Sequence, residues 1–538
     1  MGLSTKITSI LVLNKLESHN CGTHCGRNAD IAPAGMGSRA GMSLVHTGTS
    51  RCLPRIFAAA AATPEAMSLD RPLFNLITYP VHVVNGAWFA SAWAMKRWKL
   101  WRRKPAFGDA KLATSRDLAG GEGFPIGRLG RMLIRTHHES CVLMFGARGA
   151  GKSLTMGATL HHADGTNLIV QDPPKQLWDR FRSALDAKGY RTLKIDLDEP
   201  ESGLGYNPTT YLDDSMPLSW DRDVRDIANL IVADVDIAGK AGSHFRDMGA
   251  VFVKGILGWL YQHDRANATP YGVATLLLLK TDDQREQTFK TMLTNGDDSL
   301  RMAINAWRSV GLSEGGSFKT TLTNALDAWT WRSYRALTDR TDTLSWETEL
   351  TGEQPIAVFL CGGVLGGDTS RHLVRMFFGQ AAGSLARLYA KAGQLPRRTQ
   401  ILIDEGSVVG QCAPLVQVVV ELRKAGVTTF LCYQSPTQLT QYMGKANGGT
   451  IFSNSDIVIA GGLKSPQDYE LISKLAGTRT VNPMTKGRET SFGETARPIL
   501  GPDELFKLGP TKLAAVLGSK TAVVERAYRI RGREVLYT

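Results

Sequence analysis

The chain has 538 residues, of which 43% are hydrophobic and 21% are charged, and its formal net charge is +13. This length is too great for one hydrophobic core, so we expect two or three domains of ordinary globular composition. The positive charge favours an anionic partner such as nucleic acid or an acidic membrane surface, although a solvated basic surface explains it equally well. Seven scattered cysteines argue against a disulfide framework and indicate a reducing compartment.

The first 66 residues differ in composition from the rest of the chain. They are rich in Gly, Ala, Ser and Thr, and their apolar runs are too short to span a membrane. We expect residues 1–66 to be a disordered extension, or a start placed upstream of the true one at Met67. The segment from His19 to Cys25 holds two His and two Cys, but no second pair follows at zinc-site spacing. We interpret it as part of the same tail.

Residues 67–105 are predicted to form a transmembrane helix and its basic flank. The run Leu73–Met95 has 23 residues without Asp, Glu, Lys or Arg, which is long enough to cross a bilayer core of about 30 Å. Six basic residues follow within Lys96–Lys104, and such a flank stays on the cytoplasmic side. Pro80 and His82 weaken the hydropathy of the run, so an interfacial amphipathic helix or a buried helix remains the alternative.

From about residue 106 onward, short apolar runs alternate with helical patterns. This alternation predicts an α/β fold in which a parallel sheet is covered on both faces. The predicted strands are the run ending at Phe145, and then Thr166–Asp172, Arg191–Leu197, Pro355–Gly363, Thr399–Gly406, Thr428–Ser435 and Ser455–Gly462.

Between these strands, residues 209–348 show helical spacing with few strand signals. We therefore predict an all-α domain at 209–348, inserted into a nucleotide-binding domain formed by 106–208 and 349–538.

The stretch "GARGAGKS", Gly146–Ser153, fits the phosphate-loop pattern of Gly, four residues, Gly, Lys and Ser or Thr. It follows a buried strand and precedes a helix, where backbone N–H groups and the helix N-terminus attract phosphate. Lys152 is expected to reach the β- and γ-phosphates of ATP, and Ser153 to ligate Mg²⁺. The predicted nucleotide-binding residues are Gly146, Gly149, Gly151, Lys152, Ser153 and Leu154.

The stretch "ILIDE" supplies the acidic partner of this loop. A strand end presents Asp404 to the Mg²⁺ ion, and Glu405 beside it is placed to activate the attacking water. The motif is weak alone, but together with the phosphate loop in one α/β sheet it predicts ATP hydrolysis. The Asp-Glu pair fits hydrolysis better than transfer of a phosphoryl group to a small molecule.

Other polar residues at strand and helix ends have open interpretations. Gln434 ends the strand Thr428–Ser435, where it would sense the γ-phosphate or be satisfied by the backbone. Arg423, with Lys424 beside it, would reach a neighbouring subunit's nucleotide as an arginine finger or remain a surface charge. Asp172 and Lys175 would line the nucleotide pocket or pair with each other.

The order of these motifs resembles that of the TraG-like coupling protein ATPases of type IV secretion and conjugation systems. The resemblance spans residues 106–530 and includes "LIVQDPPKQLWD", "GLGYNPTTYL" and "SFKTTLTNALDAW". Its most specific block runs from "LIDEGSVVGQ" to "SNSDIVIAGG". In that block Asp404 and Glu405 fall on the family's Walker-B position, Arg423 on its arginine finger and Gln434 on its glutamine sensor.

The resemblance implies a RecA-like P-loop ATPase with an inserted all-α domain and an N-terminal membrane anchor, acting as a homo-hexamer. It further implies attachment to the bacterial inner membrane with the ATPase part in the cytoplasm. The implied partners are single-stranded DNA bound to relaxase and the components of the type IV secretion channel. The chain departs from the family in two places. Only one membrane span is defensible, and "PPKQ" replaces the usual Lys-Gly-Glu after the second strand.

Three other functions remain to be weighed against a DNA-translocating coupling ATPase. One is a coupling ATPase whose cargo is protein effectors only. Another is a membrane receptor that binds nucleotide without hydrolysing it, against which the intact Lys152, Asp404 and Glu405 argue. The last is a small-molecule kinase, which the Asp-Glu pair, the large helical insertion and the membrane segment disfavour.

Overall fold

The computed structural model of the chain describes residues 108–215, 217–233, 240–309, 312–363, 370–481, 495–527, 529–530 and 533–534. These residues belong to one compact unit, Arg103–Thr538. The predicted extension 1–66, the predicted membrane segment Leu73–Met95 and the His19–Cys25 segment lie outside the described residues. Within the described part, no helix has both the length and the apolar character needed to cross a membrane.

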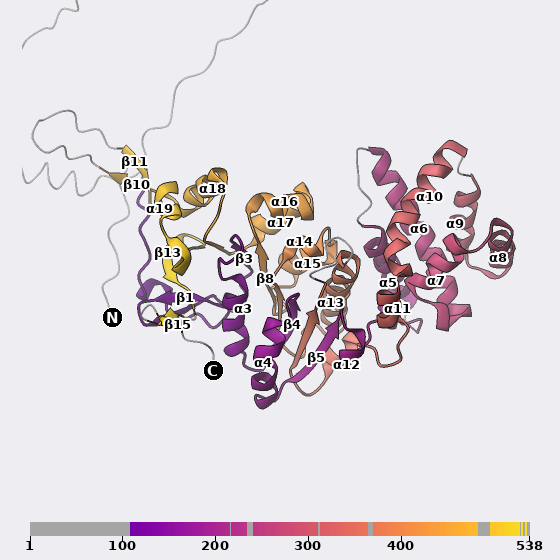
Figure 1. Ribbon diagram of the computed structural model, residues 1–538, viewed down its shortest axis with the longest axis horizontal. Helices are drawn as coiled ribbons and strands as arrows, with labels where there is room; N and C mark the ends of the chain where they lie inside the picture. Colours follow the sequence, from indigo (N-terminus) through magenta and orange to yellow (C-terminus); the bar gives the residue numbers. More distant parts are fainter. Residues whose placement is uncertain are drawn as a thin grey trace, which may run out of the picture. The chain divides into compact units, whose positions relative to one another are not determined.

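A large mixed sheet forms the centre of this unit (Figure 1). Its strands are β1 (Pro125–Leu129), β2 (Met132–Arg135), β3 (Val142–Phe145), β4 (Asn167–Asp172), β5 (Arg191–Asp196), β6 (Ile356–Cys361), β7 (Thr399–Ile403), β8 (Val427–Tyr433), β9 (Ile457–Ala460), β12 (Lys512–Leu517) and β13 (Lys520–Glu525). The eleven strands lie in the order β2-β1-β13-β12-β9-β3-β8-β7-β4-β6-β5. Two separate ribbons pair β10 (Thr478–Val481) with β11 (Thr495–Pro498), and β14 (Arg529–Ile530) with β15 (Arg533–Glu534).

The part of the sheet from β9 to β5 is parallel throughout and consists of the apolar runs predicted as strands. Every residue of β3, β4, β6 and β8 is buried, which explains why these runs are mostly apolar rather than alternating between apolar and polar residues. The parallel pairing predicted for these strands is confirmed, but the sheet continues beyond them, because β12, β13, β1 and β2, which were not predicted, extend it in antiparallel pairing. β1 and β2 carry Arg128 and Arg135 and are only partly buried, so their sequences lack the apolar signal.

Helices cover both faces of the sheet. On one face, α3 (Lys152–His161) and α4 (Gln176–Ala187) share a core with alternate residues of the central strands, and on the other face α13 (Arg371–Ala392) and α15 (Ala413–Glu421) do so. The remaining helices of this part are α14 (Gly406–Val409), α16 (Pro436–Met443), α17 (Lys445–Asn454), α18 (Pro466–Ala476) and α19 (Pro502–Phe506). Single 3₁₀ turns occur at Arg116–Leu118, Pro200–Ser202, Pro208–Tyr211, Arg265–Asn267, Ala328–Thr330 and Gly509–Thr511.

A helical region lies between β5 and β6 in the sequence, and Figure 1 shows most of its helices gathered in one group, with the last one beside β5. Its elements are α5 (Pro217–Val232), α6 (Lys240–His263), α7 (Pro270–Ala274), a π-helical turn at Thr275–Leu279, α8 (Asp282–Asn295), α9 (Asp298–Ser309), α10 (Leu312–Asp327), α11 (Arg332–Thr338) and α12 (Trp346–Thr351). Phe252 stacks on Trp307 in its interior, and its core is continuous with one face of the sheet. The domain boundaries drawn from the sequence stay predictions.

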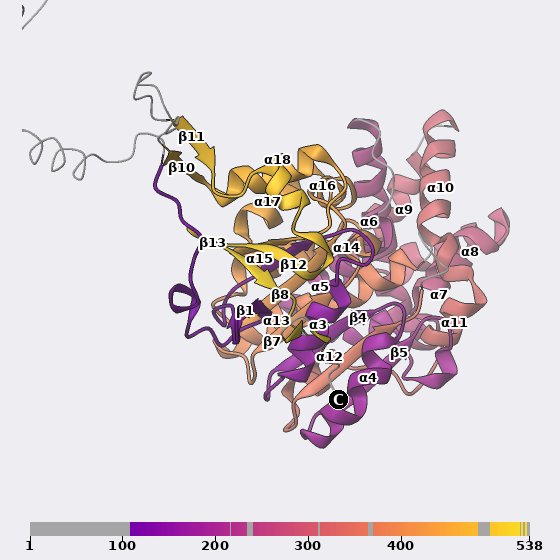
Figure 2. The same cartoon turned by 60° about the vertical axis from the view of Figure 1, so that its left-hand side comes forward.

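The antiparallel end of the sheet joins the two ends of the described chain. β13 pairs with β12 on one side and with β1 on the other, and Figures 1 and 2 show yellow β13 beside indigo β1. Because β12 reverses direction and β13 reverses it again, the carboxyl end of β13 lies at the same edge of the sheet as the carboxyl end of β3. This arrangement brings residues after β13 to the phosphate loop.

Candidate nucleotide-binding site

The phosphate loop connects buried strand β3 to helix α3, as the sequence predicts. Gly149 and Gly151 have φ angles of +81° and +86°, a conformation that residues with a Cβ adopt only with strain. Helix α3 begins at Lys152 directly after Gly151. The first N–H groups of a helix have no partner within the helix, so this end of α3 is suited to an anion.

Two side chains of the loop make defined contacts. Lys152 Nζ donates a hydrogen bond to the carbonyl of Gly146 at 2.9 Å. Ser153 Oγ donates to Asp404 Oδ2 at 2.7 Å, which links the loop to the end of β7 across 251 residues of sequence. The two predicted metal ligands therefore lie in direct contact.

Asp404 has the properties expected of a metal ligand. Its burial raises the pKa of the carboxyl, which the hydrogen bond from Ser153 and the charge of Lys152 partly oppose. Asp404 Oδ1 is buried and has no hydrogen-bond partner. A buried carboxylate oxygen beside a hydroxyl oxygen suits Mg²⁺, which prefers hard oxygen ligands, so Ser153 and Asp404 fit this ion.

Glu405 is held by its main chain as well as by its side chain. Its backbone N–H donates to Gln171 Oε1 at 3.1 Å, and its carboxylate accepts a hydrogen bond from the Ser407 hydroxyl at 2.5 Å. These contacts fix the residue that the sequence predicts as the general base. Gln171, from β4, is not among the site residues predicted from the sequence. A polar residue within an otherwise apolar strand could have indicated its role.

A cavity of about 350 Å³ opens beside the phosphate loop. Its polar lining residues are Arg148, Lys152, Gln171, Asp404, Glu405 and Gln434, and Pro173, Pro174, Leu360, Val374 and Val408 are among the rest. Gln434 is exposed and uses its backbone N–H to bind Gln438 Oε1 at 2.7 Å. The structure thus brings Lys152, Ser153, Asp404, Glu405 and Gln434 together at one edge of the sheet.

Arg423 lies at the opposite edge, where the parallel strands begin. It precedes β8, and both oxygens of Asp456 accept hydrogen bonds from its Nη1 at 2.7 Å. These bonds raise the pKa of the guanidinium, and Asp456 also accepts from the Cys141 N–H at the start of β3. Arg423 therefore does not contact the phosphate loop of its own chain. Its predicted role on a neighbouring subunit's nucleotide stays a prediction.

Neither interpretation of Asp172 and Lys175 matches the structure. Asp172 is buried and caps α4 by accepting the Trp178 N–H at 2.7 Å, and burial raises its pKa to about 6. Lys175 pairs with Asp196 at 2.9 Å. Their side chains do not pair with each other, although the Lys175 N–H donates to the Asp172 carbonyl at 3.0 Å in the turn, and neither residue lines the cavity at the loop.

A second missed contact comes from the end of β13. The Arg526 side chain is 7% exposed, and its Nη2 donates to the Gly149 carbonyl at 3.2 Å. The guanidinium also covers Gly151, where an added Cβ would lie 2.9 Å from Nη1. Only the tertiary fold brings these residues together, because 377 positions separate Gly149 from Arg526.

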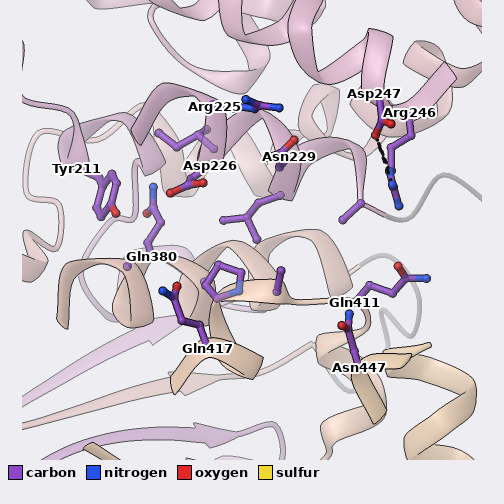
Figure 3. A pocket seen from close by; sticks show the side chains of 17 residues that line it. Tyr211, Arg225, Asp226, Asn229, Arg246, Asp247, Gln380, Gln411, Gln417 and Asn447 are labelled. Carbon is purple, nitrogen blue, oxygen red and sulfur yellow. Dashed lines mark hydrogen bonds and ion pairs between the residues drawn. The ribbon is translucent and has the colours of Figure 1, made fainter. Parts of the chain in front are cut away.

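Another cavity, of about 470 Å³, lies away from the phosphate loop (Figure 3). Helices α5 and α6 form one wall, with Asp226, Asn229 and the Arg246–Asp247 pair, and α13, α15 and α17 form the other. None of its lining residues belongs to the predicted nucleotide site. Within the described residues there is no cluster of three or more His, Cys, Asp or Glu able to hold a metal ion.

Comparison with known proteins places the chain among secretion proteins. The profile of the family described as Type IV secretory system Conjugative DNA transfer matches residues 99–526. The chain belongs to this family. This membership confirms the resemblance to TraG-like coupling proteins that the motifs indicate. The search of curated proteins gives no match.

The chain shares its fold with solved structures of the coupling protein TrwB. TrwB in complex with ADP and Mg²⁺ is 16% identical, with a TM-score of 0.61, and the match covers 80% of this chain and 96% of TrwB. The unbound monoclinic form of the conjugative coupling protein TrwBdeltaN70 is 15% identical, with a TM-score of 0.62 and coverage of 80% and 94%. At these identities the likeness concerns the fold, and it confirms the predicted α/β architecture.

Proposed function

We propose that the chain is a membrane-anchored coupling ATPase of a type IV secretion system. It would recruit a relaxase–single-stranded DNA substrate and use ATP hydrolysis to pass it to the secretion channel. Family membership supports the secretion role, and TrwB, which shares the fold, has been solved with ADP and Mg²⁺. The observation that carries the hydrolysis is the contact of Ser153 with Asp404, whose Oδ1 is buried without a partner beside Glu405.

The side chains at the loop have distinct roles in this proposal. The loop N–H groups and Lys152 bind the β- and γ-phosphates, while Ser153 and Asp404 hold Mg²⁺. When bound, the ion supplies positive charge that neutralises the phosphate oxygens. The oxygen of a water molecule bonds to the γ-phosphorus as the bond to the β,γ-bridging oxygen breaks. The water proton passes to the Glu405 carboxylate, and ADP leaves with the electron pair.

The wider assembly is part of the same proposal. Residues 67–105 would anchor the chain in the bacterial inner membrane, with residues 106–208 and 349–538 forming the cytoplasmic nucleotide-binding domain and 209–348 the all-α domain. In a homo-hexamer, Arg423 would face the nucleotide of a neighbouring copy. The net charge of +13 suits a channel that holds DNA through its phosphates without reading its sequence.

The decisive experiment is the transfer frequency of a marked plasmid in cells that carry the wild-type chain or Lys152→Ala. Loss of a phosphate-binding cation is expected to reduce hydrolysis by about 10²- to 10³-fold, and transfer should fall with it. Lys474→Ala, at an exposed position on α18, is the matched control. Undiminished transfer with Lys152→Ala would favour a receptor that does not hydrolyse ATP. ATPase activity that DNA fails to stimulate at low salt would favour a protein-only cargo.

A further inference from the structure

Gln171 lies in the candidate site, but neither the phosphate-loop motif nor the Asp404–Glu405 motif accounts for it. It is the fifth residue of β4, between β7 and β6, and its side chain is 1% exposed. Burying a carboxamide destabilises the fold when its donors and acceptor are left without partners. Apolar side chains occupy the four central positions of the adjacent strand β6, so a polar residue at this point of the sheet requires a reason.

The hydrogen bonds fix the orientation of this amide. Oε1 accepts the backbone N–H of Glu405, which can only donate, so Nε2 must point the other way. Nε2 is buried and has no hydrogen-bond partner in the protein. Gln171 lines the same cavity as Lys152, Asp404 and Glu405. A buried NH₂ group without a partner therefore belongs to a residue that lines the cavity beside the phosphate loop.

We propose that Gln171 Nε2 donates a hydrogen bond to a γ-phosphate oxygen of the bound nucleoside triphosphate, while Oε1 holds the main chain of Glu405. This inference rests on the proposed function, since it requires a triphosphate at the loop. Gln171 would thus join the γ-phosphate to the general base through one rigid side chain. After hydrolysis and phosphate release, the NH₂ group is again buried and unpaired, which favours the triphosphate over the diphosphate.

The two glutamines at the site differ in a way that assigns this role to Gln171. Gln434, to which the sequence gives the sensor role, is exposed, and only its backbone N–H has a partner. Ordering an exposed glutamine side chain on binding costs conformational entropy. Gln171 is already fixed by burial and by Glu405, so its contact with a phosphate requires no further ordering.

The test compares the affinities of the purified full chain for ADP and for the β,γ-imido analogue of ATP. In Gln171→Leu we expect the preference for the analogue over ADP to fall about 10-fold or more, since a hydrogen bond to a charged group is lost, with ADP affinity unchanged. Gln171→Glu keeps an oxygen for the Glu405 N–H and removes the donor, so the same preference should be lost. Gln287→Leu, at an exposed position on α8, is the matched control and should keep the preference. A loss of the preference in Gln434→Leu but in neither Gln171 variant would assign the γ-phosphate contact to Gln434 and overturn the inference.

Several outcomes overturn the inference. One is an unchanged preference for the analogue in both Gln171 variants. Another is an equal loss of affinity for both nucleotides together with a lower melting temperature, which would indicate a structural role only. If Gln171→Leu does not fold, the same measurements on Gln171→Glu decide. Wild-type protein that binds neither nucleotide would overturn the proposed function as well. A wild type that hydrolyses ATP, with both variants keeping its preference for the analogue, would overturn this inference alone.

Discussion

Both edges of the parallel strands carry polar and charged residues, but the edges differ in whether these groups have hydrogen-bond partners. At the amino edge, Arg423, Asp456 and the Cys141 N–H form a closed set of hydrogen bonds. At the carboxyl edge, Asp404 Oδ1 and Gln171 Nε2 are buried without partners. Buried polar groups in folded proteins almost always have partners, and these two unpaired groups belong to residues that line the cavity at the phosphate loop, so they mark that cavity as the place where a ligand binds. The paired ones are explained by the fold alone.

The largest expected effect would come from removing the proposed general base at the carboxyl edge. Glu405→Gln keeps the backbone N–H to Gln171 but cannot take a proton, so the turnover number should fall by about 10²- to 10⁴-fold with nucleotide affinity retained. Steady-state ATPase assays and nucleotide titrations measure the two quantities. Glu421→Gln, at an exposed position on α15, is the control. Full activity in Glu405→Gln would assign proton transfer to another group.

Replacing Asp172, which lies one residue beyond Gln171, should have an effect of intermediate size on stability, and this effect should depend on pH. Its pKa is raised by burial from 3.8 to about 6, so the folded state prefers the neutral carboxyl. The preference stabilises the fold fully below pH 3.8 and is lost as pH rises through about 6. Asp172→Asn retains an oxygen for the Trp178 N–H and cannot ionise. Its stability relative to the wild type should therefore increase between pH 4 and pH 7, by at most about 3 kcal/mol.

Chemical denaturation of both proteins across this pH range gives the difference directly. Asp283→Asn, on the exposed side of α8, serves as the comparison because it alters a carboxylate outside the sheet. If the wild type and Asp172→Asn respond to pH in parallel, the pKa of Asp172 is the same in the folded and unfolded states, and burial does not raise it.

The smallest effect is expected at the amino edge. The side chains of Arg423 and Asp456 are 34% and 40% exposed, and exposed ion pairs contribute about 0.2–1 kcal/mol. Asp456→Asn should therefore lower the free energy of unfolding by about 1 kcal/mol or less and leave nucleotide affinity unchanged, as denaturation and titration will measure. If Arg423→Ala loses ATPase activity and Asp456→Asn does not, Arg423 acts in catalysis at the nucleotide of a neighbouring copy.

The sequence predicts the phosphate loop and its acidic partner well because both are local patterns. The spacing of Gly146, Gly151 and Lys152 and the apolar run before Asp404 determine a loop and a strand end regardless of distant contacts. The contributions of Gln171 and Arg526 depend instead on tertiary structure. Gln171 is held by the backbone N–H of Glu405, at the end of a neighbouring strand. Arg526 reaches the Gly149 carbonyl only because β12 and β13 extend the sheet, and the strand pattern did not predict these two strands.

The position of Arg526 also has a consequence for the order in which the protein folds. The phosphate loop is synthesised early, but the strand that leads to the guanidinium covering Gly149 and Gly151 follows more than 300 residues later. Closing so long a segment is entropically costly, so this contact should form late on the folding pathway. A nascent chain that has not yet made β12 and β13 carries the complete nucleotide motif without its cover, and β1 and β2 have no sheet to join. The cover over the phosphate loop is thus completed near the end of folding, after the sheet has closed.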